Sequence, residues 1–424
     1  MNGNDRPIWL VSGLRTPFVR VDGPLAHRDT LGLSVPVVQA MAATAKGPID
    51  FAVWGAVVLN LSYNNLAREV WLEAGLDPHI PTFTTIMQCS TSMVAAFEAA
   101  GMLNQHGRAL ALAGGVESMS RVQIGLTPGL SFWIRRLVEA RNFSQRLTRL
   151  GELQLRDIRL KIPEVKNRAT GKSMGEHCED MAKTWNIGRR EQDEVALRSH
   201  QRAVAGQERS FFTDLIVPVD GVSQDAFPRR DTSIERLTAL KPVFDRTSGK
   251  GTLTAGNSSP LTDGAAGIWV ANDEGLARLP VSLPRARLVD FEIAAVDLYR
   301  EGLLMAPVSA IPRLLSRHRL TFDDIVLWEI HEAFAAQLLC HIKGLDDKSF
   351  VREKAGVEHT FGTLPRDRIN PNGGSVALGH PFAATGARIL SQAVKELAEL
   401  PKGSRAIVSI CADGGLGTVA LLES

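Results

Sequence analysis

Cys89 is the residue best suited to covalent chemistry, because it stands at a turn between an extended stretch and an apolar helix. The turn is the run 87–93, the extended stretch is 81–86 and the helix is 94–103. Unpaired N–H groups and the macrodipole at a helix N-terminus favour a thiolate, which is the nucleophilic form of cysteine. Cys89 is therefore a candidate nucleophile. The competing interpretation is a small buried cysteine whose role is packing.

Three residues near the C-terminus carry the other groups that carbon–carbon chemistry on a thioester requires. His380 lies in a glycine-rich turn (373–381), and imidazole is the usual base for a thiol at neutral pH. Cys411 also lies among glycines, and a free thiol pKa near 8.5 suits exchange of a proton α to a carbonyl. His331 follows a predicted strand. Each of them alone is more often structural, but together with Cys89 they indicate one catalytic constellation.

Two oxyanions form in such a reaction, so hydrogen-bond donors are needed in two places. We expect backbone N–H groups at Cys89 and in the Asp413–Gly414 turn to form one oxyanion hole. We expect His380, with a water or ring N–H held by His331, to form the other.

The elements that must position these groups alternate between strands and helices. This spacing indicates a mixed or parallel sheet with helices on both faces. The principal expected strands are 8–12, 52–59, 109–113, 267–271, 285–296, 325–330 and 406–410, and the principal expected helices are 31–45, 66–74, 94–103, 307–318 and 383–400.

The end of the chain repeats its beginning. The turn 373–381 leads into a small-residue helix much as 87–93 leads into its own helix, and the strand before Cys411 matches the strand before Gly114. Two copies of one βαβ arrangement related by a pseudo-twofold axis would place Cys89 opposite His380.

Composition excludes several other classes of protein. The 424 residues carry 48 Lys and Arg against 46 Asp and Glu, and the net charge of +2 predicts no nucleic-acid partner. Four cysteines without a C-x-x-C spacing predict no metal site and favour a reduced, cytoplasmic setting.

A basic segment interrupts the alternating pattern. Residues 121–170 contain eleven Lys and Arg against four Asp and Glu, with apolar residues at near-helical spacing. Three interpretations stay open: a surface helix packed on its own domain, a docking surface for an anionic membrane or a partner subunit, or arginines that bind the phosphates of coenzyme A.

Four stretches together resemble the motifs of the thiolase family, and the resemblance covers nearly the whole chain. They are the histidine motif 379–388, the cysteine-glycine motif 411–417, the pantetheine-side loop 257–265 and the strand end 114–119. The resemblance implies an acyltransferase that uses coenzyme A as co-substrate and holds no permanent cofactor.

The resemblance also implies roles for single residues. Cys89 would be acylated, His380 would activate it, Cys411 would handle the α-proton, and His331 would hold the catalytic water. Asp413 would contribute its backbone N–H. The residues that would contact substrate or coenzyme A are Ser259, Asn257, Phe334 and Gly414.

The fold implied by the resemblance is α/β, with duplicated halves in a layered αβαβα core and an inserted, mostly helical loop domain. We expect an N-terminal half at 1–120 completed by 251–278, and a C-terminal half at 279–424. The loop domain at 121–250 would hold the acyl and coenzyme A pocket.

His331 in the sequence His-Glu-Ala-Phe, together with the basic insertion, is similar to the thiolase β-subunits of fatty-acid β-oxidation complexes. Most biosynthetic members carry Asn at this place. We therefore expect cleavage of 3-ketoacyl-CoA to acetyl-CoA and a shortened acyl-CoA. The expected partners are acyl-CoA and CoA, a second copy in a homodimer or homotetramer, a hydratase–dehydrogenase α-subunit, and peripheral membrane contact through 121–170.

Two alternatives stay open, the first within the same superfamily and the second from another class of protein. One is a condensing enzyme that forms acetoacetyl-CoA or a carrier-protein product, although Cys411 argues against the carrier-protein type. The other is a scaffold or membrane-docking subunit whose catalysis is secondary.

The chain departs from the family pattern at three places. Asp413 stands where Gly or Ala is usual, Ala383 replaces a frequent Gly, and Ser92 replaces the Gly of many biosynthetic members. A carboxylate near a developing oxyanion opposes catalysis unless it points away or is paired, so Asp413 is the most consequential.

Overall fold

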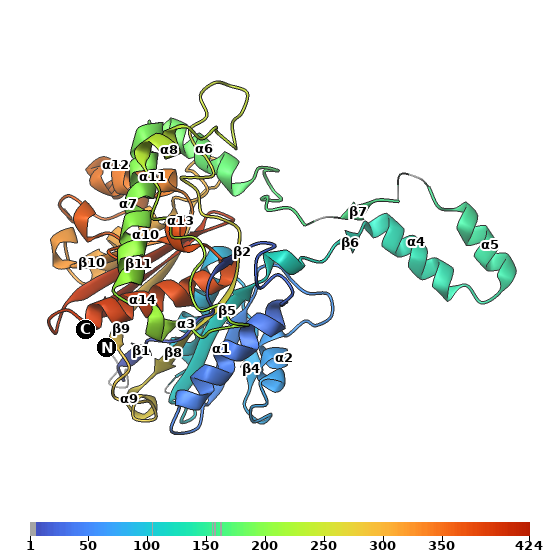
Figure 1. The fold of residues 1–424 in the computed structure, drawn as a ribbon, viewed down its shortest axis with the longest axis horizontal. Helices are drawn as coiled ribbons and strands as arrows, with labels where there is room; N and C mark the ends of the chain where they lie inside the picture. The colour runs from blue at the N-terminus through green and yellow to red at the C-terminus, as the bar shows by residue number, and fades with distance from the viewer. Residues whose placement is uncertain (1–5, 104, 155, 157, 162) are drawn as a thin grey trace.

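A computed structural model of the chain describes residues 6–103, 105–154, 156, 158–161 and 163–424. The body is built on a ten-stranded sheet, with nine strands in the order β4–β3–β5–β8–β1–β9–β12–β11–β10 and β2 paired to β8 (Figure 1). The strands are β1 (Ile8–Val11), β2 (Val19–Arg20), β3 (Phe51–Gly55), β4 (Thr82–Phe83), β5 (Leu110–Glu117), β8 (Thr262–Ala271), β9 (Arg285–Ala295), β10 (Leu327–Ile330), β11 (Arg405–Ala412) and β12 (Leu416–Glu423).

The sheet consists of two equivalent halves that meet where β1 and β9 pair antiparallel. In the first half β3 and β5 are parallel, and β8 runs antiparallel to both β5 and β1. In the second half β10 and β11 are parallel, and β12 runs antiparallel to both β11 and β9. The duplication predicted from the sequence is therefore confirmed.

The two halves of the sheet alternate with three layers of helices, so the body has five layers. The central layer is α3 (Thr91–Met102) and α14 (Thr385–Ala398), which pack on each other and on strands of both halves. Helices α1 (Thr30–Thr44) and α2 (Leu66–Glu73) cover the outer side of the first half. The outer side of the second half is covered by α10 (Ala306–Arg317), α11 (Ala335–Asp346) and α12 (Lys348–Ala355). The αβαβα core is thus confirmed, with one apolar cluster around each of its three helical layers.

Several expected strands have different ends in the structure. The strand expected at 52–59 stops at Gly55, because the Glu117 carboxylate accepts the N–H groups of Val57 and Val58 and draws the chain out of the ladder. Strand β5 instead continues through its two glycines to Glu117. Side chains do not fit at these glycines, since a Cβ on Gly115 would meet the carbonyl oxygen of Ala383 at 2.3 Å.

The segment inserted between β5 and β8 has two parts. The part nearer the C-terminus packs on the body and contains α6 (Met174–Thr184), α7 (Arg189–Glu208) and α8 (Ile234–Thr238). Helices α6 and α7 pack on α11 of the C-terminal half, and α8 packs on α7. The domain boundaries proposed from the sequence stay predictions.

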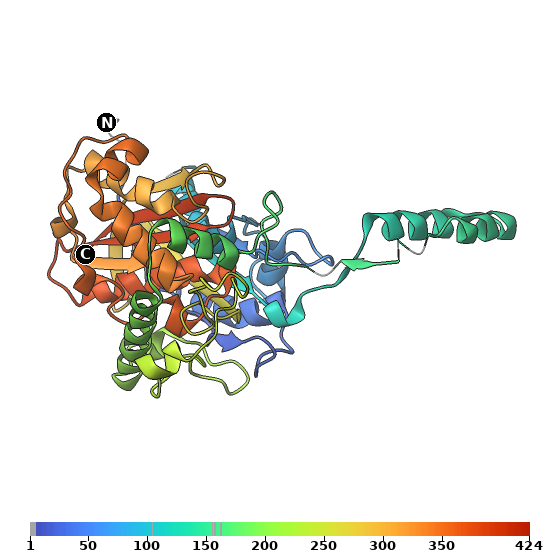
Figure 2. The same cartoon turned by 90° about the horizontal axis from the view of Figure 1, so that it is seen from above.

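The second part, residues 125–161, projects away from the body in both views and is called the arm below (Figures 1 and 2). Strands β6 (Gly125–Leu126) and β7 (Leu160–Lys161) pair at its base, and α4 (Pro128–Glu139) and α5 (Phe143–Gly151) form its tip. None of the helices in the described part of the chain is long and apolar enough to cross a membrane.

A buried ion pair ties the inserted segment to the first half. Arg15 donates to both carboxylate oxygens of Asp225, at 2.6 and 2.7 Å, and the side chains are only 4% and 1% exposed. Asp225 also accepts the N–H of Phe18 at 2.8 Å. Both charges are therefore buried and paired directly with each other.

We expect Asp225→Ala to lower the free energy of unfolding by about 3–5 kcal/mol, because it leaves a buried guanidinium without its partner. Equilibrium unfolding in urea measures this loss. Glu208→Ala is the matched control, since its ion pair with Arg230 is 51% and 70% exposed and should contribute below about 1 kcal/mol. Equal losses for the two variants would contradict the assignment.

Candidate active site

Residues from both halves of the sheet meet at one apolar cavity of about 250 Å³. Cys89, His380 and Cys411 line it, as do the predicted contact residues Ser259 and Phe334. The other lining residues are Val165, Ser173, Met174, Gly175, Phe244, Ser258, Leu261, Leu304, Ala333 and Phe382. The predicted juxtaposition of Cys89 and His380 is therefore present in the structure.

Cys89 is held in a short 3₁₀ turn that runs directly into α3. Gln88, immediately before it, adopts a left-handed backbone with φ of 49°, an uncommon conformation that turns the chain sharply at the sulfur. The hydroxyl of Thr91 accepts the N–H of Met87 and donates to the carbonyl of Gln88, which braces this turn.

The protonation of Cys89 differs from the expectation based on the helix terminus. Burial raises the pKa of the Cys89 thiol to about 12, and the negative charges of Asp413 and Glu117 act in the same direction. Hydrogen bonds from the backbone N–H groups of Asp413 and Cys89 lower this pKa but do not outweigh the loss of water. Cys89 therefore rests as a thiol, and a base must remove its proton during the reaction.

His380 is placed to be that base. One ring nitrogen, Nδ1, lies 2.6 Å from the hydroxyl of Thr385, whereas Nε2 is buried without a hydrogen-bond partner among the described residues. Burial lowers the pKa of His380 to about 3, so its imidazole is neutral. The Cys89 sulfur and one nitrogen each from His331 and His380 lie within 4.8 Å of one another.

His331 lies beside His380, with ring centroids 4.3 Å apart. Its Nδ1 is 2.9 Å from the hydroxyl of Ser375, which also accepts a hydrogen bond from Arg388 at 2.8 Å. Because a guanidinium only donates, the Ser375 hydrogen is free to point at Nδ1, and the imidazole proton then resides on Nε2. That nitrogen is buried and, in the part of the chain that is described, has no acceptor. His331 therefore has an N–H available for an oxyanion.

Cys411 completes the group at the end of β11. Burial, together with the nearby Cys89, raises the pKa of the Cys411 thiol well above its usual value. It thus holds a proton that it can give to a carbanion.

Asp413, two residues further on, is paired as an active site requires. Its carboxylate accepts hydrogen bonds from Asn167 at 2.7 Å and from the N–H of Gly414 at 2.6 Å.

Two predicted contact residues do not line the cavity. The side chain of Asn257 is fully buried and bonds instead to Asp193, Thr252 and Thr254, so it shapes the loop that carries Ser259. The N–H of Gly414 is occupied by the Asp413 carboxylate, which leaves the Asp413 N–H as the donor facing Cys89.

The sequence argument missed the residues that hold the catalytic groups. Thr385 and Ser375 lie within five residues of His380 in the chain, so polar residues flanking a motif histidine are a signal that was available. Glu117, whose pKa burial raises to about 7, had no role assigned to its carboxylate. Asn167 had no sequence signal, because it lies 246 residues from Asp413.

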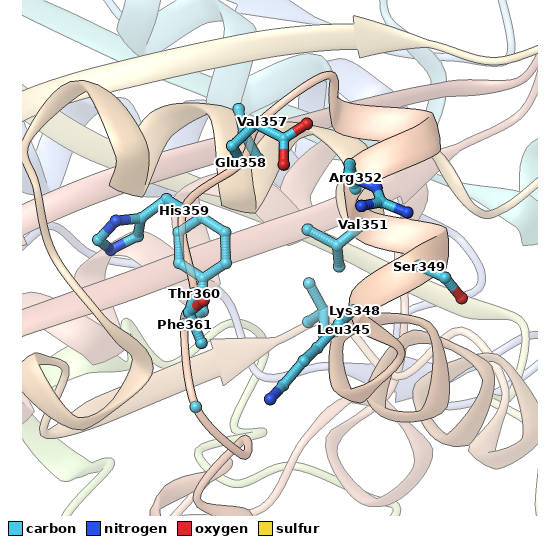
Figure 3. Close-up of a pocket in the computed structure, with 11 residues that line it drawn as sticks. Leu345, Lys348, Ser349, Val351, Arg352, Val357, Glu358, His359, Thr360 and Phe361 are labelled. Atoms are coloured by element: carbon cyan, nitrogen blue, oxygen red, sulfur yellow. The ribbon is translucent and has the colours of Figure 1, made fainter.

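A second cavity, of about 230 Å³, adjoins the first and shares Ser258 with it. Arg229 and Arg236 line it, together with His200. A third pocket, of about 360 Å³, lies at residues 345–362 beside α12 (Figure 3). It contains none of the predicted site residues, so the catalytic site is the apolar cavity.

Comparison with known proteins agrees with this geometry. The family model described as the N-terminal domain of thiolase matches residues 8–274, and the model of the C-terminal domain matches residues 282–424. A 3-ketoacyl-CoA thiolase of Yersinia enterocolitica is 36% identical over 98% of this chain and 96% of its own length. A protein of the same name from Yersinia pestis is 35% identical with the same coverage.

Solved structures give the same result. The acetyl-CoA acetyltransferase of Bacillus anthracis superposes with a TM-score of 0.80 at 29% identity, covering 99% of this chain and all of that one. The Acat5 thiolase of Ascaris suum in complex with coenzyme A has a TM-score of 0.79 at 25% identity and the same coverage. With both family domains matched in order and full-length relatives above 30% identity, this chain belongs to the thiolase family of acyltransferases.

Proposed function

We propose that the protein is a degradative 3-ketoacyl-CoA thiolase, which cleaves a 3-ketoacyl-CoA with CoA to acetyl-CoA and an acyl-CoA shorter by two carbons. The observation that carries the proposal is the meeting of three groups at one apolar cavity: a thiol, an imidazole nitrogen that has no hydrogen-bond partner among the described residues, and a second thiol. The names of the full-length relatives support the same substrate class.

In the first half-reaction, Nε2 of His380 takes the Cys89 proton while the sulfur attacks the 3-keto carbon. Collapse of this adduct breaks the bond between C2 and C3, which leaves an acyl group on Cys89 and the enolate of acetyl-CoA. Cys411 donates its proton to the enolate carbon and becomes a thiolate, and acetyl-CoA leaves.

In the second half-reaction, the Cys411 thiolate removes the proton of an incoming CoA thiol. The CoA sulfur attacks the acyl carbonyl, and Cys89 departs and recovers its proton from His380. Every group returns to its resting state. The C2–C3 bond and the S–H bond of CoA have been exchanged for a thioester C–S bond and a C–H bond of acetyl-CoA.

Fixed donors stabilise the charge that develops in each step. The N–H groups of Cys89 and Asp413 serve the oxyanion on the carbon attached to Cys89. His331 and the protonated His380 serve the thioester oxygen of the enolate. These donors need little reorganisation, because Thr385 and Ser375 hold the two rings from behind.

The two adjoining cavities fit the two parts of coenzyme A. The apolar cavity, walled by Phe244, Phe334 and Met174, suits an acyl chain and the pantetheine arm. The neighbouring cavity contains Arg229 and Arg236, which suit the nucleotide phosphates. We therefore propose Arg229 and Arg236 as the phosphate contacts, in place of the arginines of residues 121–170.

We also propose that the arm is a peripheral contact for an anionic membrane. Its apolar side chains face solvent, with Val138, Phe143 and Leu147 exposed by 75%, 80% and 60%. The hairpin of α4 and α5 is held together by a hydrogen bond from Trp133 to the carbonyl of Arg149 at 2.6 Å. Basic and apolar residues on a projecting hairpin match the requirements of an interfacial helix.

The remaining partners are proposals of the same kind. We expect a homodimer or homotetramer in the cytoplasm and a hydratase–dehydrogenase subunit as the enzyme that supplies 3-ketoacyl-CoA. The alternative of acetoacetyl-CoA synthesis is favoured by the name of the Bacillus anthracis structure, and the choice of substrate separates it from the proposal.

We expect CoA-dependent cleavage of 3-ketoacyl-CoAs from four to sixteen carbons to strengthen with chain length, because the cavity walls are apolar. Loss of the enolate absorbance measures the rate. Cys89→Ala should abolish turnover, and Cys411→Ala should lower it by about a thousandfold while Cys89 is still acylated. The control is Cys340→Ala, a buried cysteine of α11 outside the cavity, which should stay within about twofold of the wild type.

Activity confined to the four-carbon substrate would instead support acetoacetyl-CoA metabolism. Full activity in Cys89→Ala would contradict the proposed mechanism.

For the arm, we expect a variant in which an Asn-Gly turn replaces residues 127–159 to lose binding to anionic vesicles. The design is possible because Leu126 and Leu160 are paired across β6 and β7, so a two-residue turn can join them. Wild-type binding, measured by vesicle sedimentation, should require anionic lipid and weaken at high salt. Equal binding by the wild type and the shortened variant, or binding that does not depend on salt, would refute the contact. Retained thiolysis by the shortened variant shows that it is folded.

A further inference from the structure

The segment that returns from the arm touches the catalytic cysteine-glycine turn directly. Asn167 donates a hydrogen bond from Nδ2 to Oδ1 of Asp413, at 2.7 Å. Asn167 is 7% exposed and Asp413 is half-buried, so the contact is partly shielded from water. The pair joins the inserted segment to a turn whose first residue is Cys411.

The orientation of the Asn167 amide is determined by its surroundings. Its side-chain oxygen accepts the N–H groups of Ala169 at 2.9 Å and Thr170 at 3.1 Å. Its backbone N–H donates to Lys172, and its backbone carbonyl accepts the N–H of Gly171. With the oxygen occupied by donors, the NH₂ group must face Asp413.

The backbone N–H and the carboxylate of Asp413 act on Cys89 in opposite directions. Its backbone N–H makes a hydrogen bond to the sulfur of Cys89, which favours negative charge there. Its carboxylate carries a negative charge close enough to act against the thiolate of the same cysteine. A residue at this position helps the reaction only if the N–H faces the sulfur and the carboxylate is held away.

We propose that Asn167 is a positioning residue that holds the Asp413 carboxylate against the inserted segment, so that Asp413 presents its backbone N–H to Cys89. The proposal rests on the proposed function only in taking Cys89 as the nucleophile. It explains how a chain with Asp at this position keeps a working oxyanion hole.

The charged and titratable groups around Cys89 and Asp413 indicate why Asn167 must hold the Asp413 carboxylate. The other titratable groups around Cys89 are Glu117 from β5, His331, His380 and Cys411. Around Asp413, besides Cys89 itself, the structure places His177 of α6, which lies 2.7 Å from the hydroxyl of Thr170. Within the described residues no Lys or Arg side chain forms an ion pair with Asp413, so neutral donors alone hold its charge.

Three variants test the proposal through the rate of Cys89 alkylation by iodoacetamide at a fixed pH of about 8.5, followed by peptide mass spectrometry. Below the thiol pKa this rate is proportional to the thiolate fraction. Asn167→Asp keeps the oxygen that accepts from Ala169 and Thr170 but sets a second carboxylate against Asp413. We expect the alkylation rate and kcat each to fall about tenfold. Asp413→Asn removes the charge, and we expect the alkylation rate to rise about tenfold.

The double variant Asn167→Asp with Asp413→Asn exchanges the amide and the acid. The hydrogen bond can then re-form in the opposite direction with the charge farther from Cys89, so the alkylation rate and kcat should return to wild-type values or better. The control is Asn186→Asp, which adds the same charge at an exposed position after α6 and should leave both unchanged.

An unchanged alkylation rate in Asn167→Asp would overturn the proposal. A double variant as impaired as Asn167→Asp would also overturn it, because Asn167 would then act only through the fold of its own turn. The alkylation assay needs no substrate. If the wild type cleaves no 3-ketoacyl-CoA but the alkylation rates change as expected, the proposed function fails while the role of Asn167 stands.

Discussion

Burial of the reacting groups sets their protonation. Loss of hydration disfavours charge, so Cys89 and Cys411 are held as thiols and His331 and His380 as neutral imidazoles. These four side chains consequently carry no charge until substrate binds. Charge appears only as protons move, and it appears beside donors that are already in place. The supporting residues Thr385, Ser375 and Arg388 matter for the same reason, since a neutral ring is useful only in the correct tautomer and orientation.

The duplicated scaffold is what brings these groups together. Cys89 comes from the turn before α3 and His380 from the turn before α14, and those two helices form the layer shared by both halves of the sheet. Their approach depends on glycine, because a Cβ on Gly386 would meet the backbone nitrogen of Met93 at 2.4 Å. The close packing of the central layer therefore also fixes how the nucleophile Cys89 and the base His380 are aligned.

Much of this arrangement could be predicted from the sequence, for identifiable reasons. Glycine-rich turns after apolar runs indicated where Cys89, His380 and Cys411 leave the sheet, and the repeat of those turns predicted that the two halves would face each other. The protonation of Cys89 was not predictable in this way, because burial depends on the whole cavity while the helix-terminus argument considers one turn. Asn257 shows the same limit, since its neighbours Asp193 and Thr252 occupy the polar atoms that had been expected to meet a ligand. Asn167 could not be found at all, because its partner lies in a distant part of the chain.

The central claim is that carbon–carbon cleavage passes through an acyl group on Cys89. The most direct test is intact-protein mass spectrometry after mixing the enzyme with 3-ketohexadecanoyl-CoA and no free CoA, followed by peptide mapping. The mechanism predicts a mass increase equal to one fourteen-carbon acyl group, located on the peptide that contains Cys89 and discharged when CoA is added. Release of acetyl-CoA with the acyl group on another residue, or with no covalent adduct at all, would contradict it.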